Sequence, residues 1–105
     1  MANIDPKIIS EFKSALKKAY GERVERAVLY GSRARGDHQP DSDYDVAVFI
    51  HDHRTFGEEA RRLADITTDI LIDTGADISA LPFPAGAWRN RTGFMHEVRK
   101  DGIDL

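Results

Sequence analysis

Residues 31–45 read GSRARGDHQPDSDYD, and this stretch carries the strongest structural signals in the chain. It follows a short segment rich in β-forming residues, 24–30, which predicts a strand that stops at the Gly-Ser pair. Residues 32–35 can then form a short helix, and residues 36–42 are loop-forming throughout. The apolar run that ends at residue 50 predicts a second strand over 43–50, with its end deeply buried.

The rest of the chain predicts three helices and one more strand. Hydrophobic periodicity, N-cap residues and terminal glycines bound these elements: a helix that begins after Asp5 at Pro6 and ends at Gly21, a helix from Thr55 to about Gly75, a strand over 76–81, and a helix from Asn90 or Thr92 to Lys100. We expect Pro82 and Pro84 to terminate the strand. These elements predict an α/β (α+β) fold, in which a small mixed β-sheet has its helices packed on one side.

The composition indicates a single domain over residues 1–105. The chain has 15 Lys and Arg against 18 Asp and Glu, a net charge of −3, which disfavours nucleic acid as a direct partner. Because cysteine is absent, disulfides and thiolate chemistry are excluded. The longest apolar run, 46–50, is too short to cross a bilayer, and the N-terminus has no signal-peptide pattern. We therefore expect a cytoplasmic protein with no membrane partner.

Asp43 and Asp45 are candidate metal ligands. Residues two apart on a strand point to the same face, about 6.5–7 Å apart at the backbone. Two carboxylates beside a buried apolar run repel each other unless a cation lies between them, and a divalent ion would relieve that repulsion. The alternative is an exposed transition from loop to strand with no ligand.

Gly31 and Ser32 are candidate phosphate ligands. A glycine lets the backbone approach a ligand closely, and free N–H groups at a helix start can hold a phosphate together with the serine hydroxyl. Arg33 and Arg35 add two permanent cations beside this turn. Taken singly, a Gly-Ser turn is commonly simple turn chemistry and such arginines are commonly solvated. Their combination with the acidic pair favours a phosphate site that contains a metal ion.

Asp77 is the candidate third carboxylate. It stands at the start of the predicted third strand, between two apolar residues, where an exposed acid would be an unusual choice. Asp73 is the competing candidate, but it falls on the last turn of the preceding predicted helix, where a solvated side chain is expected.

The pattern resembles the signature of the polymerase-β-like nucleotidyltransferases. The shared features are Gly31-Ser32, ten intervening residues, and then Asp43-Tyr44-Asp45. The fuller form, GSRARG over 31–36 with Ser42 before the acidic pair, resembles the minimal nucleotidyltransferases, the MntA-type antitoxins. The resemblance spans nearly the whole chain, and the paired motif is its specific part.

This resemblance implies the polymerase-β-like fold and an enzyme that transfers a nucleotidyl group, usually AMP from ATP, to a hydroxyl. The residues that match the catalytic and metal-binding positions, with two Mg²⁺ ions implied, are Asp43, Asp45 and Asp77. Those that match the nucleotide-binding region are Gly31, Ser32, Arg33 and Arg35.

Proteins of this family often pair with a HEPN ribonuclease toxin and silence it by adenylylating a tyrosine, so the resemblance implies a toxin partner. Two other functions stay open: an antitoxin that only masks its toxin, and an enzyme that modifies a small hydroxylated molecule. With 105 residues, the chain has little surface for an acceptor pocket of its own. This size favours a protein acceptor, or a homo- or hetero-oligomer that completes the site.

Overall fold

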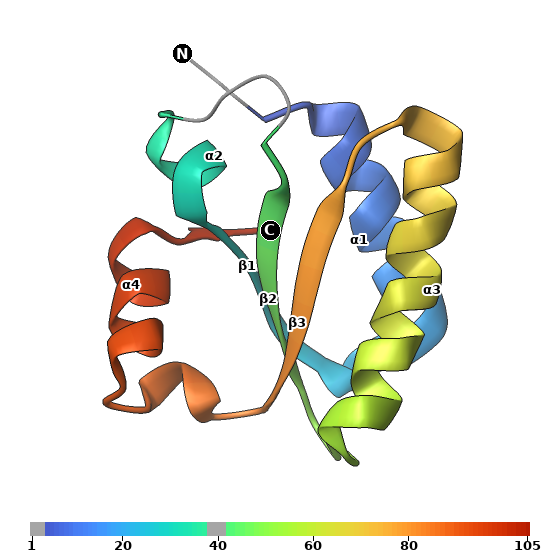
Figure 1. The fold of residues 1–105 in the computed structure, drawn as a ribbon. Coiled ribbons are helices and arrows are strands. Elements are labelled where there is room, and N and C mark those ends of the chain that lie inside the picture. Colours follow the sequence, from blue (N-terminus) through green and yellow to red (C-terminus); the bar gives the residue numbers. More distant parts are fainter. Residues whose placement is uncertain (1–3, 38–41) are drawn as a thin grey trace.

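The computed structural model describes residues 4–37 and 42–105, so residues 38–41 of the predicted loop lie outside it. Within these ranges the strands form one mixed sheet in the order β3-β2-β1-β4 (Figure 1). β1 pairs antiparallel with β2 and β4, and β2 pairs parallel with β3. The elements are α1 (Pro6–Tyr20), η1 (Gly21–Arg23), β1 (Val24–Tyr30), α2 (Gly31–Arg35), β2 (Tyr44–Ile50), α3 (Phe56–Thr74), β3 (Ile78–Pro84), η2 (Ala87–Arg89), α4 (Gly93–Asp101) and β4 (Ile103–Asp104).

Helices cover both faces of the sheet (Figure 1). α1 and α3 pack on one face, around a core that includes Phe12 and Leu29. α4 packs on the other face, where Val98 joins a cluster with Val28 and Phe49. The predicted α/β class is confirmed, but the expectation that all helices lie on one side is wrong for α4. Since β1 and β2 are buried at successive positions, both of their faces require cover.

The predicted helix starts are confirmed. The side chains of Asp5, Thr55 and Thr92 each accept a hydrogen bond from a backbone N–H in the first turn of α1, α3 and α4, respectively. Such N-caps satisfy donors that have no partner inside the helix. The short helix expected after the Gly-Ser pair is present as α2. In the described part of the chain, no helix is long and apolar enough to span a membrane.

β3 continues to Pro84, beyond its predicted end. The N–H of Ala85 donates to the carbonyl of Ile50 on β2, so residue 85 and the alternate residues before it turn their backbone groups towards β2. Pro82 and Pro84 alternate with these residues, and their nitrogens lie on the free edge of the sheet. Because β3 is an edge strand, proline removes no hydrogen bond there. The prediction that the strand stops before Pro82 is wrong, whereas Pro84 is its last residue, as expected for a terminating proline.

Glu59 is a buried charge near the start of α3 that contacts residues of α1 and η1. Its carboxylate lies 3.0 Å from Nη2 of Arg23 in η1 and accepts a hydrogen bond from the Tyr20 hydroxyl at 3.4 Å. The backbone N–H of Arg54 also donates to it, at 3.3 Å. With only 2% of Glu59 exposed, this group fixes the start of α3 against the end of α1.

Glu59→Gln is expected to reduce the free energy of unfolding by about 1–2 kcal/mol, because hydrogen bonds to a charged acceptor become neutral ones. Thermal denaturation measures this change. Glu97→Gln, on an exposed position of α4, is the matched control, with an expected change within about 0.5 kcal/mol. Equal melting temperatures for the two variants would show that the Glu59 charge contributes nothing to stability.

Candidate active site

Asp43 and Asp45 lie where β2 starts and β1 ends. Asp45 pairs with Tyr30, the last residue of β1, whereas Asp43 precedes the strand and is exposed. Side-chain alternation places both carboxylates on the face that α4 covers further along the sheet. Burial raises the pKa of Asp45 and the charge of Asp43 raises it further, while Arg35 lowers it. The two carboxylates therefore interact unfavourably, as the sequence predicts for an acidic pair without a cation.

Gly31 brings the turn after β1 against the carboxylate of Asp45. Its φ of +79° lies in the left-handed region that favours glycine. A Cβ atom at this position would lie 2.5 Å from Oδ2 of Asp45 and 3.3 Å from its Cγ. The geometry thus requires glycine for two reasons, the backbone conformation and the close approach of an acidic side chain.

Ser32 lies in the first turn of α2, beside Gly31. The side chain of Tyr30, at the N-cap, makes no capping hydrogen bond. The carbonyl of Ser32 accepts a hydrogen bond from the N–H of Gly36 at 2.9 Å, which closes this short helix. Because first-turn N–H groups have no partner within their helix, those of Gly31 and Ser32 are the candidate backbone donors next to Asp45.

Arg33 braces the segment that carries the acidic pair. Its guanidinium carbon lies 4.1 Å from the ring centroid of Tyr44, and its Nε donates to the carbonyl of Ser42 at 2.9 Å. The Tyr44 hydroxyl in turn accepts a hydrogen bond from the backbone N–H of Asp5 at 3.2 Å. Ser42 and Tyr44 flank Asp43, so these contacts position the start of β2. Sequence reasoning missed this positioning role, and nucleotide binding by Arg33 stays a prediction.

Arg35 lies between the acidic pair and α4. Its Nε donates to Oδ2 of Asp37 at 3.1 Å, and its Nη1 lies 3.6 Å from Oδ2 of Asp101. The side chain is 44% exposed, and it is near enough to Asp45 to lower the pKa of that carboxyl. Arg35 is thus a cation that faces both solvent and the acidic pair.

Asp77 lies immediately before β3, on the strand next to the acidic pair. The register of β2 and β3 pairs Tyr44 with Ile78, and the N–H of Tyr44 donates to the carbonyl of Asp77 at 2.9 Å. Continuing this register by one residue places the backbone of Asp77 beside that of Asp43. The backbone of Asp77 therefore lies next to the acidic pair, as predicted.

The carboxylate of Asp77 does not join those of Asp43 and Asp45 in one cluster. Within residues 4–37 and 42–105, no three acidic, histidine or cysteine side chains gather in a way that would hold a metal ion. Asp77 instead lines a pocket of about 300 Å³ that also includes Arg33 and Tyr44.

The competing candidate, Asp73, lies in α3 and faces α1. A hydrogen bond with Asp73, together with burial and the Asp73 charge, raises the pKa of Glu11 in α1. Both residues line the surface between the two helices, on the face of the sheet opposite to Asp45. Of the two aspartates weighed for the third carboxylate, Asp77 is the one adjacent to the acidic pair.

Tyr30 belongs to the same region, although sequence reasoning did not single it out. It is the residue paired with Asp45 across β1 and β2, and its ring lies 5.4 Å from that of Phe94 in α4, edge to face. Burial, together with the charge of Asp45, raises the pKa of Tyr30 to about 12. Only the antiparallel register shows this proximity, because in sequence Tyr30 is simply the end of a strand.

Comparison with known proteins identifies the class to which this fold and site belong. Residues 9–83 match the family model described as a nucleotidyltransferase domain. This match covers most of the chain and includes the Gly-Ser turn, the acidic pair and Asp77. The chain belongs to the nucleotidyltransferase domain family, and it is a nucleotidyltransferase.

Two relatives come from Methanocaldococcus jannaschii, and each is named “Putative protein adenylyltransferase”. The first is 28% identical over 98 residues, which cover 93% of this chain and 95% of the relative. The second is 33% identical over 78 residues, which cover 73% of this chain and 71% of the relative. The chain thus matches proteins of similar size, as well as the shared domain.

Two solved structures share the fold. A “putative nucleotidyltransferase” from Sulfolobus solfataricus superposes with a TM-score of 0.65 at 16% identity, covering 93% of this chain and 76% of its own. A mutant of the toxin-antitoxin MntA-HpeT superposes with a TM-score of 0.67 at 14% identity, covering 90% of this chain and 69% of its own. These likenesses confirm that the sheet and its helices form a nucleotidyltransferase fold.

Proposed function

We propose that this protein transfers AMP from ATP to a tyrosine hydroxyl of a partner toxin of the HEPN class, and so acts as an antitoxin by protein adenylylation. The observation that carries the proposal is the contact between Gly31 and Asp45, which places a phosphate-type turn against an acidic pair. The names of the two relatives support a protein acceptor, and the toxin-antitoxin structure supports a toxin as that acceptor.

The acidic pair fits a divalent metal ion. Asp43 and Asp45 offer hard carboxylate oxygens, which Mg²⁺ prefers, and their mutual repulsion is what a cation would relieve. Asp77, on the neighbouring strand, is the third ligand we propose; in the structure its carboxylate is not gathered with the acidic pair, so it would have to turn towards the pair to complete a set for two Mg²⁺ ions. When bound, the metal would supply Lewis-acid stabilisation of charge on the phosphate oxygens.

The remaining side chains have separable roles in this proposal. The backbone donors of Gly31 and Ser32 bind the triphosphate, and Arg35 neutralises part of its charge. The acceptor oxygen forms a bond to the α-phosphorus while the bond to the β-phosphate oxygen breaks, so pyrophosphate leaves. An Oδ atom of Asp77 takes the proton of the acceptor hydroxyl. Arg33 holds the start of β2 in place, beside the nucleotide site that it is also proposed to line.

The test is the intact mass of the partner toxin after incubation with this protein, Mg²⁺ and ATP. We expect the toxin to gain one or more AMP groups on tyrosine, and we expect no gain with an Asp43→Asn, Asp45→Asn double variant. A toxin that stays unmodified but forms a tight complex would identify a masking antitoxin instead. If the toxin is neither bound nor modified, a small hydroxylated acceptor becomes the better hypothesis.

A further inference from the structure

An aromatic cluster occupies the sheet face that carries Asp45. The ring of Phe94, in the first turn of α4, lies 5.4 Å from that of Tyr30 and 5.5 Å from that of Phe83 on β3. Phe83 stacks on Phe49 at 5.6 Å, so the cluster continues into the core between the sheet and α4. Phe94 therefore packs against aromatic rings from β1 and β3, and the Phe83 ring is in turn stacked on a ring from β2.

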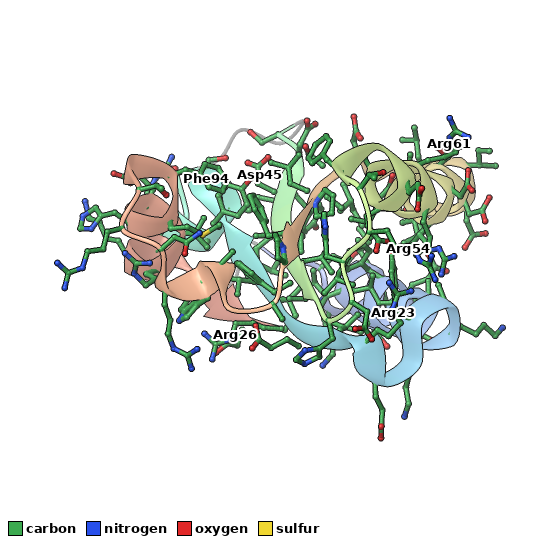
Figure 2. All side chains as sticks on the ribbon, turned by 90° about the horizontal axis from the view of Figure 1, so that it is seen from below. Arg23, Arg26, Asp45, Arg54, Arg61 and Phe94 are labelled. Atoms are coloured by element: carbon green, nitrogen blue, oxygen red, sulfur yellow. The ribbon has the colours of Figure 1, made fainter. Side chains whose placement is uncertain are left out.

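The cluster begins next to the proposed phosphate and metal site. Tyr30 is the register partner of Asp45, and residues paired in this way lie about 4.5–5.5 Å apart at Cα. Figure 2 shows the side chains of Asp45 and Phe94 on the same side of the sheet, towards α4. Tyr30 thus links an acidic, metal-type end at Asp45 to an aromatic end at Phe94 on one face of the sheet.

Phe94 leaves much of its surface open to solvent. It is 39% exposed, although its ring contacts those of Tyr30 and Phe83. The other large hydrophobic residues exposed in the described part of the chain belong to α3 and β4. Phe94 is therefore the exposed apolar side chain that shares a face with the acidic pair.

We propose that Phe94, supported by Tyr30 and Phe83, is the platform on which the base of the bound nucleotide stacks. The inference rests on the proposed function, since it adds a site for the nucleotide base to the phosphate site proposed at Gly31 and Ser32. A nucleotide has an anionic triphosphate at one end and a flat aromatic base at the other. The metal-binding pair and the Gly-Ser turn would meet the triphosphate, and the ring of Phe94 would meet the base. Aromatic side chains that stack a base contribute substantially to affinity and tolerate different bases.

The experiment compares the binding of Mg²⁺-ATP and of Mg²⁺-tripolyphosphate, which lacks a base, by isothermal titration calorimetry. Phe94→Leu keeps an apolar side chain on Tyr30 and Phe83 but removes the aromatic face. We expect it to weaken ATP binding about tenfold and to leave tripolyphosphate binding unchanged. Phe94→Tyr should retain the affinity of the wild type for ATP. Phe56→Leu, on an exposed aromatic residue of α3, is the matched control and should alter neither affinity.

The outcomes separate this inference from the proposed function, because no acceptor is needed to measure binding. An unchanged ATP affinity in Phe94→Leu, or an equal loss of ATP and tripolyphosphate affinity, would overturn the stacking role. A selective loss of ATP affinity supports the base site even if the toxin proves not to be the acceptor. If the wild-type protein binds tripolyphosphate but binds ATP no more tightly, the base site is wrong and the phosphate site stands.

Discussion

Asp45→Asn is expected to reduce AMP transfer by about a hundred- to a thousandfold, a loss comparable with removing a preorganised electrostatic group from an enzyme site. The asparagine keeps the shape of the side chain beside Gly31 but removes the charge that would hold a cation. Transfer is measured with the partner toxin as acceptor, and metal dependence is followed by titrating Mg²⁺. Asp65→Asn, an exposed carboxylate on α3, is the control and should retain wild-type rates. Transfer by Asp45→Asn at more than a tenth of the wild-type rate would contradict the metal-binding role.

The same variant is expected to raise the melting temperature of the metal-free protein. Burial and the charge of Asp43 raise the pKa of Asp45 in the folded state, so the folded protein binds more protons than the unfolded chain over the interval between the two pKa values. Protonated Asp45 is tolerated in the fold, so the free energy of unfolding is highest below the unfolded-state pKa of Asp45. It falls as the pH rises through the folded-state pKa, because the buried carboxylate then becomes charged. We therefore expect the advantage of Asp45→Asn to be absent in acid and to appear towards neutral pH. A melting temperature at pH 7 that is lower than that of the wild type would show that the charge stabilises the fold.

Most of the fold was accessible from local sequence signals. The caps at Asp5 and Thr55 fixed two helix starts within a residue, because an N-cap is a contact between near neighbours in the chain. For the last helix the sequence left Asn90 and Thr92 open, and the structure has Thr92 as the cap. The position of α4 and the effect of Pro82 on β3 were predicted wrongly for a shared reason. Both depend on which strand lies at the edge of the sheet and which faces need cover, and these follow from tertiary packing rather than from local pattern.

The candidate site likewise has parts that local sequence spacing predicts and parts that depend on tertiary packing. The Gly-Ser turn and the Asp-x-Asp pair are spacings within the chain, and the structure places them in contact through Gly31 and Asp45. The bracing role of Arg33 depends on the distance between its guanidinium and the ring of Tyr44, which lies eleven positions further along the chain. Tyr30 and Phe94 meet only because β1 ends under α4. Contacts of this kind leave no local signal, so the sequence indicated the charged groups, Arg33 among them, but not the contacts that position them.

Gly31→Ala is expected to abolish transfer and to destabilise the fold by about 2–4 kcal/mol. A non-glycine residue in the left-handed region costs about 1 kcal/mol, and the added methyl group must also displace the carboxylate of Asp45, which lies 2.5 Å from the position of the new Cβ. The displacement moves Asp45 away from the turn, so nucleotide binding and transfer are lost together. Thermal denaturation, calorimetry with Mg²⁺-ATP and the transfer assay measure the three effects on the same preparation.

Gly86→Ala separates backbone strain from the contact with Asp45. Gly86 also has a positive φ, +91°, but a Cβ atom there meets nothing within 4 Å, and the residue lies before η2, away from the acidic pair. It should therefore lose only about 1 kcal/mol of stability and keep full transfer activity. In Gly31→Ala, the further substitution Asp45→Ala removes the obstructing carboxylate and should restore part of the lost stability without restoring activity. Equal stability losses in Gly31→Ala and Gly86→Ala would show that a methyl group at residue 31 does not clash with Asp45. The close contact between the turn and the acidic pair would then be refuted.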